Sequence, residues 1–321
     1  MKSSRLICGL IALTLFLIGG VGDVAAQGGN AKSKQKKKLP QSFKWVNPLT
    51  DADKKLTGLE HGAFQSRSLK QDVGYCIYLP PEYRNDVQAT KRFPVVYYLH
   101  GGRPGSERKS IKLAAEFEKH IKAGSVSPMI YVFVNGGPVS HYNMPDDPKA
   151  QGADVFIKEL IPHIDKTYRT IAGKMSRGLE GFSQGGRGTA RLMFRYPELF
   201  CSASPGGGGH ATEKKISENG GAESVNLKFA EGDNTWDLAH QYAERMKANH
   251  GLQDLAILVH VGDKGFNYPN NLEWMKMLES LGIKHVKIVV PEAGHSALQI
   301  YQKRGLEIMT FHATNFVKAQ E

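Results

Sequence analysis

A serine between two glycines has the residue types of a nucleophile elbow. The run Gly181-Phe182-Ser183-Gln184-Gly185 fits the pattern G-x-S-x-G. In that motif a strand ends in a sharp turn and a helix starts at once, so the serine hydroxyl is presented at the tip. Residues 170–180 can supply the strand, and residues 188–196 read as a helix that Pro197 ends. The bare pattern also fits a glycine-rich surface turn, but this context predicts that Ser183 is a nucleophile.

A serine hydroxyl needs a base to take its proton and a carboxylate to orient that base. In α/β proteins whose serine lies in such an elbow, the three residues follow one another along the chain in the order serine, acid, histidine. His295 follows a strand expected at residues 286–290 and is the predicted base. Asp263, after a strand expected at 255–261, is the predicted acid. Asp233 and Asp237 are alternative acids, and a site with no acid is a third possibility.

Two backbone amides are expected to bind the negative charge that forms on a substrate carbonyl oxygen. One is the amide of Gln184, at the start of the helix after the serine. The second is expected from Gly102 or Arg103, in the His-Gly-Gly loop after an apolar run at 93–99. The remaining candidates for substrate contact are side chains in loops at the strand ends: Arg103, His141, Tyr142 and Trp236.

The elements that must position these residues alternate between strands and helices. Strands are expected at 73–79, 93–99, 129–134, 200–204, 255–261 and 286–290, and helices at 111–123, 155–168, 235–249, 270–281 and 297–317. This alternation predicts an α/β fold with a mostly parallel central sheet and helices on both faces. Six glycine- or histidine-containing segments follow expected strands, at the end of the sheet where ligands bind in such folds.

Four motifs carry a resemblance to a known family. They are Tyr98-Leu99-His100-Gly101-Gly102, Glu159-Leu160-Ile161-Pro162-His163-Ile164-Asp165, Gly181 to Gly186, and Gly294-His295. Together they resemble the esterase D / feruloyl-esterase-like family of α/β-hydrolases, over roughly residues 69–316. The resemblance implies the α/β-hydrolase fold and hydrolysis of carboxylic esters through an acyl-enzyme, with no cofactor. It also implies an acid in a G-x-x-D pattern, yet Gly262-Asp263-Lys264-Gly265 has glycine at that position.

The N-terminal residues differ in composition from the rest of the chain. Residues 1–26 read as a signal peptide, with cleavage expected after Ala26, and residues 27–45 as a basic disordered leader. Residues 46–321 are the expected hydrolase domain. A cleaved signal predicts a secreted or periplasmic protein without stable membrane insertion.

Composition narrows the classes of partner. The 321 residues are 40% hydrophobic and 23% charged, enough for a sizeable core. Of the net charge of +11, about +5 comes from the leader and about +1 from the signal peptide, which leaves roughly +5 on the folded part. The sequence has no basic stripe with interleaved aromatic residues, so nucleic-acid binding is not expected. No metal-site spacing is found, so no metal is expected. Cys76 and Cys201 would remain after export, either as a disulfide or as two buried thiols.

These observations predict a secreted serine esterase. Its expected substrates are acyl, acetyl or feruloyl esters, on a polysaccharide or on a small molecule. One alternative is a catalytically silent relative that binds glycans, and another is a serine peptidase on the same fold.

Overall fold

The computed structural model describes residues 43–85, 89–210, 230–248 and 255–318. It separates Met1–Leu39 from a compact unit, Pro40–Glu321. The expected signal peptide and nearly all of the expected leader lie outside the described residues.

Eight strands form one sheet in the described part of the chain, in the order β1-β2-β4-β3-β5-β6-β7-β8. From β4 to β8 all neighbouring strands are parallel, whereas β1 and β2 pair antiparallel and β2 joins β4 antiparallel. The strands are β1 (Leu59–Ser66), β2 (Gln71–Tyr78), β3 (Val95–Leu99), β4 (Ile130–Val134), β5 (Arg177–Phe182), β6 (Ser202–Gly206), β7 (Ala256–Gly262) and β8 (Val286–Val290). The predicted mostly parallel sheet is confirmed.

Burial explains which strands the sequence reveals. Every residue of β3 and β4 is buried, as continuous apolar runs require when helices cover both faces of a sheet. The edge strand β1 was not predicted, because its sequence has few apolar residues and most of its side chains are partly or fully exposed. It forms through its antiparallel pairing with β2.

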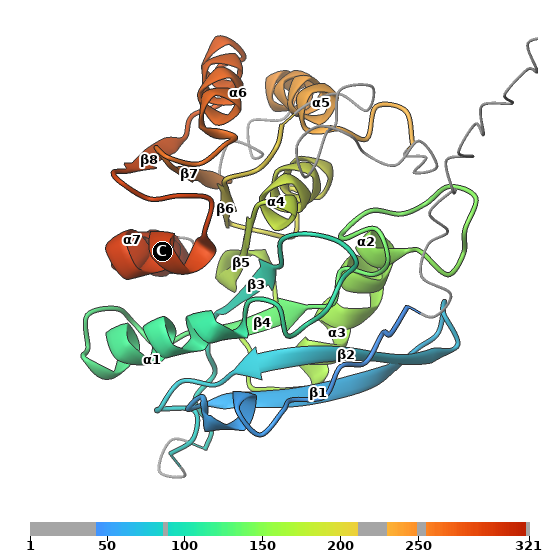
Figure 1. Cartoon of the computed structure of the whole chain (residues 1–321), viewed down its shortest axis with the longest axis vertical. Helices are drawn as coiled ribbons and strands as arrows, with labels where there is room; N and C mark the ends of the chain where they lie inside the picture. The colour runs from blue at the N-terminus through green and yellow to red at the C-terminus, as the bar shows by residue number, and fades with distance from the viewer. Residues whose placement is uncertain (1–42, 86–88, 211–229, 249–254, 319–321) are drawn as a thin grey trace, which may run out of the picture. The chain divides into compact units, whose positions relative to one another are not determined.

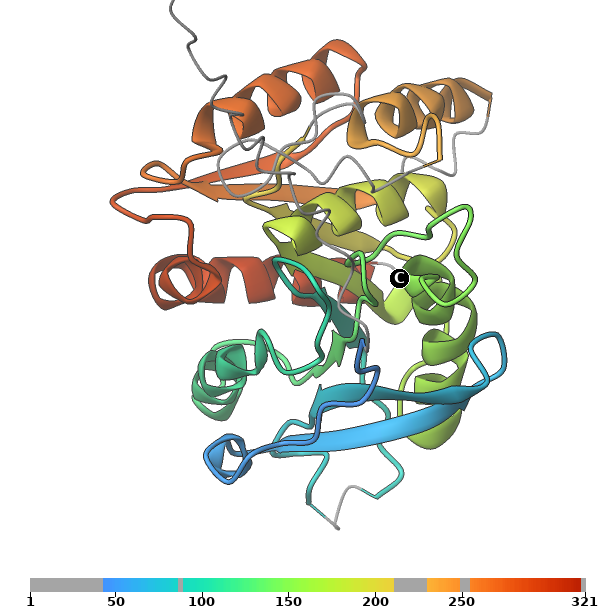
Figure 2. The same ribbon diagram turned by 45° about the vertical axis from the view of Figure 1, so that its right-hand side comes forward.

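Helices cover both faces of the sheet (Figures 1 and 2). On one face, α1 (Ala114–Lys122) and α7 (Ala297–Lys318) share a hydrophobic core with the strands. The second core contains residues of α2 (Gly152–Asp154), α3 (Ile161–Thr167), α4 (Gln184–Arg195), α5 (Thr235–Ala248) and α6 (Tyr268–Ser280). Short 3₁₀ helices lie at Asp53–Lys55, Ile111–Leu113 and Lys174–Ser176. None of the described helices is both long and apolar enough to cross a membrane.

The helix expected at 155–168 changes its winding along its length. Between α2 and α3 the chain forms a π-helical stretch, Val155–Leu160. Pro162, at the start of α3, has no N–H and cannot donate the hydrogen bond of an α-helix to the preceding turn. We attribute the wider turn before Pro162 to this missing donor.

The fold begins before the expected domain boundary. Trp45, assigned from the sequence to the leader, is only 4% exposed. Its carbonyl accepts hydrogen bonds from the Gly74 amide at 2.7 Å and from the Asn135 side chain at 3.0 Å. The boundary at 45/46 is therefore wrong by a few residues, because a tryptophan in a polar stretch packs against the domain.

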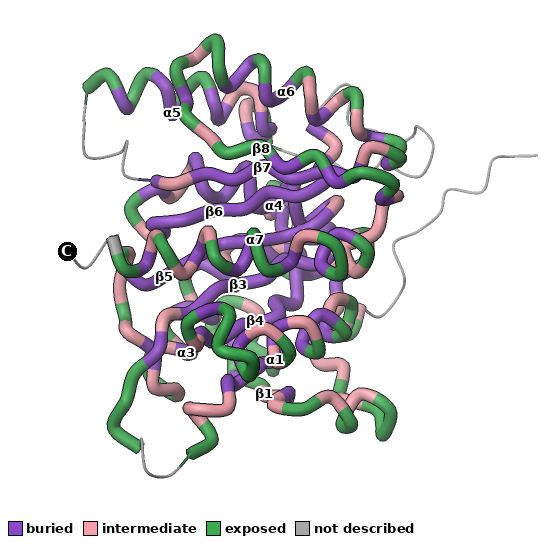
Figure 3. The backbone as a smooth tube through the Cα atoms, turned by 90° about the vertical axis from the view of Figure 1, so that its left-hand side faces the viewer, coloured by how far each residue is buried: buried purple, intermediate pink, exposed green. Residues whose placement is uncertain are grey.

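The two cysteines in the described part of the chain are buried free thiols. Cys76 lies in β2 and Cys201 just before β6, and neither forms a disulfide. Burial raises the pKa of both thiols, so they are poor nucleophiles. The tube in Figure 3 shows that the central strands of the sheet are buried along most of their length.

Candidate active site

Ser183 lies at the tip of a strained turn between β5 and α4. Its backbone has φ of 62° and ψ of −117°, a conformation that residues with a Cβ rarely adopt. Its N–H donates to the Gly206 carbonyl of β6 at 2.8 Å. A Cβ at Gly185 would lie 1.9 Å from the Leu99 carbonyl oxygen, and one at Gly186 would lie 2.1 Å from that of Gly206. Glycine is thus required for this helix to approach the neighbouring strand ends, as the motif predicts.

His295 contacts the serine directly. It lies in the loop between β8 and α7, and its Nε2 is 2.8 Å from Ser183 Oγ. Burial lowers the pKa of His295, which favours the neutral ring that a base requires. Because Nε2 must accept the serine proton, the ring proton belongs on Nδ1. Nδ1 is buried and has no hydrogen-bond partner among the described residues.

Asp263 does not complete a triad in this structure. Its Oδ1 is buried without a partner, and His295 Nδ1 likewise has none among the residues described. A Cβ added at Gly265 would lie 3.9 Å from the backbone nitrogen of His295. A side chain at position 265 would therefore project beside the histidine loop. The expectation that a two-residue shift would let Asp263 serve as the acid is not supported by this geometry.

The alternative acids bind elsewhere. Asp233 is 2% exposed and forms ion pairs with Arg191 and, at 2.9 Å, with Arg195. Asp237 accepts a hydrogen bond from the Asn234 side chain at 2.8 Å in the first turn of α5. Neither carboxylate hydrogen-bonds to His295, and the third possibility, a site without an acid, stays a prediction.

The two amides expected to bind the oxyanion belong to segments that meet at Ser183. Gln184 is the first residue of α4, where a helix amide has no partner within the helix. The loop containing Gly102 follows β3, which pairs with β5. A Cβ at the adjacent Gly101 would lie 3.1 Å from the Ser183 Cβ. The roles of Gln184 and Gly102 as oxyanion donors stay predictions.

The residues expected to contact substrate are less accessible than the sequence suggested. His141 and Tyr142 are almost fully buried, and the Arg191 guanidinium carbon lies 3.5 Å from the centre of the Tyr142 ring. They hold the loop after β4 in place and do not line an open cleft, because Arg191 from α4 inserts beside them. Arg103 donates to the Val139 carbonyl at 3.1 Å. Trp236 is half-buried and donates to the His210 carbonyl at 3.2 Å.

The loops after β3 and β4 are joined by buried hydrogen bonds. His141 Nε2 donates to the His100 carbonyl at 3.0 Å, and His100 Nε2 accepts from the Gly136 amide at 3.2 Å. Glu107 is buried and accepts from the side chain of Asn135 at 2.9 Å and from the amide of Asn47 at 2.6 Å. Burial lowers the pKa of His100 and that of His141, the latter to about 3, so both rings are neutral.

Two phenylalanines beside His295 were not recognised from the sequence. The Phe182 ring lies 4.9 Å from the His295 ring, and the Phe266 ring lies 4.2 Å from it, centre to centre. Each occupies an informative position, because Phe182 directly precedes the serine and Phe266 directly follows Gly265. Their positions next to Ser183 and Gly265 are the sequence signal from which these two residues could have been recognised.

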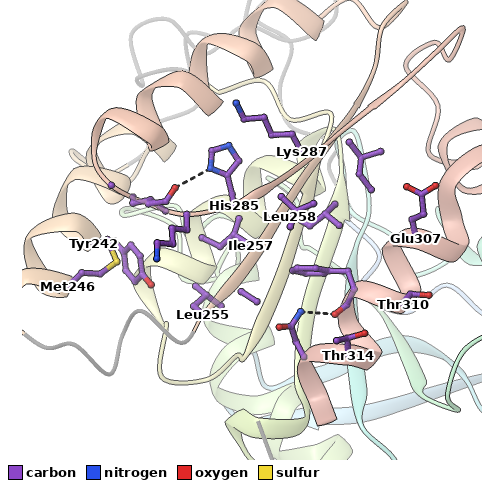
Figure 4. A pocket seen from close by; sticks show the side chains of 18 of the residues that line it. Tyr242, Met246, Leu255, Ile257, Leu258, His285, Lys287, Glu307, Thr310 and Thr314 are labelled. Carbon is purple, nitrogen blue, oxygen red and sulfur yellow. Dashed lines mark hydrogen bonds between the residues drawn. The ribbon is translucent and has the colours of Figure 1, made fainter. Parts of the chain in front are cut away.

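The large cavity in Figure 4 is remote from the serine. Its volume is about 1090 Å³. It is lined by the first residues of β7 and β8, whereas Ser183 follows the last residue of the parallel strand β5. The cavity thus lies toward the opposite end of the sheet. Its lining includes Tyr242, Met246, Leu255, Ile257, His285, Lys287 and Thr310.

A family model described as "Putative esterase" matches residues 66–297. The chain belongs to this esterase family. The match spans the strands that carry the elbow and the histidine, and it confirms the predicted esterase family.

Two characterised relatives match a smaller part of the chain. An esterase of Mycobacterium tuberculosis is 29% identical over 144 residues, which are 44% of this chain and 30% of that protein. An endo-1,4-beta-xylanase/feruloyl esterase of Xylanibacter ruminicola is 31% identical over 134 residues, 39% of this chain and 18% of that protein. The chain therefore matches less than a third of the length of either relative.

Solved structures of similar fold include serine hydrolases. A ferulic acid esterase superposes with a TM-score of 0.65 at 22% identity, covering 80% of this chain and 98% of that chain. A fluorophosphonate-binding serine hydrolase of Staphylococcus aureus gives a TM-score of 0.62 at 15% identity, covering 78% and 98%. At these identities the likeness concerns the fold, and it confirms the α/β-hydrolase architecture.

Proposed function

We propose that this protein is a secreted serine esterase that uses Ser183 and His295 as a catalytic dyad. The observation that carries the proposal is the 2.8 Å contact between Ser183 Oγ and His295 Nε2 at the tip of a nucleophile elbow. A hydroxyl and a neutral imidazole in this arrangement can exchange a proton as the serine attacks a carbonyl carbon.

The reaction proceeds in two steps on this dyad. In the first, Nε2 takes the hydroxyl proton, Oγ bonds to the ester carbonyl carbon, and the Gln184 and Gly102 amides bind the oxyanion. Nε2–H then gives its proton to the leaving alcohol, which leaves an acyl group on Ser183. In the second step water attacks the acyl carbon by the same proton transfers and releases the acid.

The proposed substrates are acetyl, feruloyl or other acyl esters on an exported polysaccharide or on a small alcohol. Two features support this class. One of the matching relatives is named a xylanase and feruloyl esterase, and a ferulic acid esterase has the same fold. The first 26 residues have the composition of a signal peptide, which would bring the enzyme to polymers outside the cytoplasm.

Labelling of the serine tests the proposal. A fluorophosphonate should add one adduct at Ser183, and the protein should hydrolyse p-nitrophenyl acetate. Ser183→Ala should abolish the label and lower kcat at least about 10³-fold. Ser280→Ala, at the end of α6, should retain both. An unlabelled, inactive wild-type protein would contradict the proposal.

A second function is favoured by one specific observation, the missing acid beside His295. A relative that has lost catalysis could still bind glycans at the strand ends. Retention on an acetylated or feruloylated xylan column by wild-type protein that neither takes the label nor releases acetate or ferulate would support this alternative. Release of either acid, measured by chromatography, would support the esterase and identify the acyl group.

A further inference from the structure

The base in the dyad lacks its usual orienting contact. In a complete triad a carboxylate accepts a hydrogen bond from Nδ1–H, which fixes both the tautomer and the rotation of the ring. Here Nδ1 of His295 has no partner among the described residues, and Gly265 lies where a side chain would project beside the histidine loop. The single polar contact that the structure shows for the imidazole is the one to Ser183. A single hydrogen bond leaves the imidazole ring free to rotate about the axis of that bond.

Aromatic rings make the remaining contacts with the imidazole. Phe182, at the end of β5, is 5% exposed and its ring is inclined at 42° to that of His295. Phe266, in the loop after β7, has its ring inclined at 46° to that of His295. These rings come from two different strand ends, so together they restrict how the imidazole can turn.

Phe266 is unusual in its exposure. At 74% it is the most exposed large apolar side chain in the described part of the chain. A side chain this exposed contributes little to stability through burial, so core packing does not explain why a phenylalanine occupies this position. Its one aromatic contact is with His295, and the residue before it is the glycine at the position of the absent acid.

We propose that Phe266 is a positioning residue that, together with Phe182, holds His295 for catalysis in place of a carboxylate. This inference rests on the proposed esterase function. Phe266 limits rotation of the neutral ring, which keeps Nε2 directed at Ser183. When Nε2 takes the serine proton, the π faces of the two phenylalanines stabilise the imidazolium that forms.

Substitutions at Phe266 test the role without disturbing the core. With p-nitrophenyl acetate, whose acyl group is too small to stack on Phe266, Phe266→Ala should lower kcat about 10-fold and leave KM within about twofold. Phe266→Tyr should restore kcat, whereas Phe266→Leu, of similar volume but without a π face, should restore it in part. The acidic limb of the pH profile should move to lower pH in Phe266→Ala, because the imidazolium loses a stabilising ring. Met175→Ala, which removes another exposed apolar side chain (46%), should change neither parameter.

A double-variant cycle separates orientation from general packing. Gly265→Asp places a carboxylate beside the histidine loop, and Gly265→Ala is its matched control, with the same Cβ and no charge. If the carboxylate orients His295, Phe266→Ala should cost less than about threefold in the Gly265→Asp background. It should still cost about 10-fold in the Gly265→Ala background. Should Gly265→Asp fail to fold, the comparison of Phe266→Ala, Phe266→Leu and Phe266→Tyr decides alone.

Three outcomes would overturn the proposal. They are an unchanged kcat in Phe266→Ala, a rise in KM alone, which would make Phe266 a substrate contact, and an equal loss in both Gly265 backgrounds. Each of these requires an active wild-type enzyme labelled at Ser183. Failure of the esterase proposal is therefore distinguishable, because it would appear as an unlabelled and inactive wild type.

Discussion

The loops on the two sides of Ser183 differ in how their polar groups are connected. On the β3–β4 side, the carboxylate of Glu107 and the ring of His100 each connect separate loops through buried hydrogen bonds. On the β7–β8 side, His295 Nδ1 and Asp263 Oδ1 are both buried without a partner in the described chain. Hydrogen bonds thus join the loops on the β3–β4 side, although Nδ1 of His141 has no partner there among the described residues, whereas the imidazole of His295 is held by one hydrogen bond, to Ser183.

This difference shows that the hydrogen bonds that hold the loops around the site are separate from those that would orient the catalytic histidine. Buried polar groups without partners reduce stability, typically by about 1–3 kcal/mol each. His295 Nδ1 is the unpaired atom whose partner in a complete triad is a carboxylate, so its lack of a partner is the difference that bears on catalysis. The two aspartates proposed from the sequence also differ, because Asp233 forms ion pairs with two arginines, whereas Oδ1 of Asp263 has no partner among the described residues.

The largest expected effect is at Asp233. Its replacement by alanine leaves the buried guanidinium of Arg191 without its carboxylate, and it should lower the free energy of unfolding by about 3–5 kcal/mol. Urea denaturation measures the change. Asp237→Ala, which removes a carboxylate bound to one asparagine, should cost less than about 1 kcal/mol. Equal losses in the two variants would show that the Asp233 ion pairs are not a special feature of the fold.

Acid should destabilise the protein through its buried histidines. Burial lowers the folded-state pKa of His260, as of His141, to about 3, below the ordinary histidine value of 6.5. The unfolded chain therefore binds more protons below pH 6.5, so stability is lost as the pH falls from 6.5 toward 3. Each such histidine contributes a slope of about 1.4 kcal/mol per pH unit.

Denaturation at several pH values between 7 and 4 measures this slope. His260→Asn should reduce the slope by the contribution of one histidine. His240 is exposed, so His240→Gln should leave the slope unchanged. A slope that His260→Asn does not alter would contradict the assignment of His260 as buried and neutral.

A smaller effect is expected in the pH profile of hydrolysis. Because burial lowers the pKa of His295, the acidic limb of kcat/KM should lie below pH 6.5. Gly265→Asp should move that limb to higher pH, since a carboxylate stabilises the imidazolium. A wild-type limb at or above pH 6.5 would indicate that a negative charge already acts on His295, and would remove the contrast between the two sides of the site.

The smallest effect is expected at Asp263. Asp263→Ala should change kcat by less than about threefold, because its carboxylate makes no hydrogen bond with His295. A carboxylate that completed a triad would be worth about 10⁴-fold. Steady-state kinetics with p-nitrophenyl acetate distinguish the two cases, and a large loss would restore Asp263 as the acid.

The sequence predicts those features that depend on local pattern. Ser183 was identified from glycine spacing, and His295 from its place after the last strand. Central strands such as β3 and β4 were identified from continuous apolar runs. In each case neighbouring residues in the chain impose the structure.

Features set by distant contacts were missed. Tyr142 is buried because Arg191 of another element covers it, and β1 forms because β2 pairs with it. Whether Asp263 can reach His295 depends on where the turn directs its side chain. The two-residue offset from the G-x-x-D pattern does not reveal that direction. Trp45 packs on loops that lie far along the chain.

The glycines of the elbow affect what the sequences of such proteins can tell about their evolution. At Gly185 and Gly186 an added methyl group would overlap backbone atoms of neighbouring strand ends. Substitution there would disrupt the sheet whether or not the protein were an enzyme. A descendant that abandoned catalysis would keep these glycines for as long as it kept its fold. Their persistence records the ancestry of the architecture, and the identities of residues 183, 265 and 295 record the fate of the chemistry.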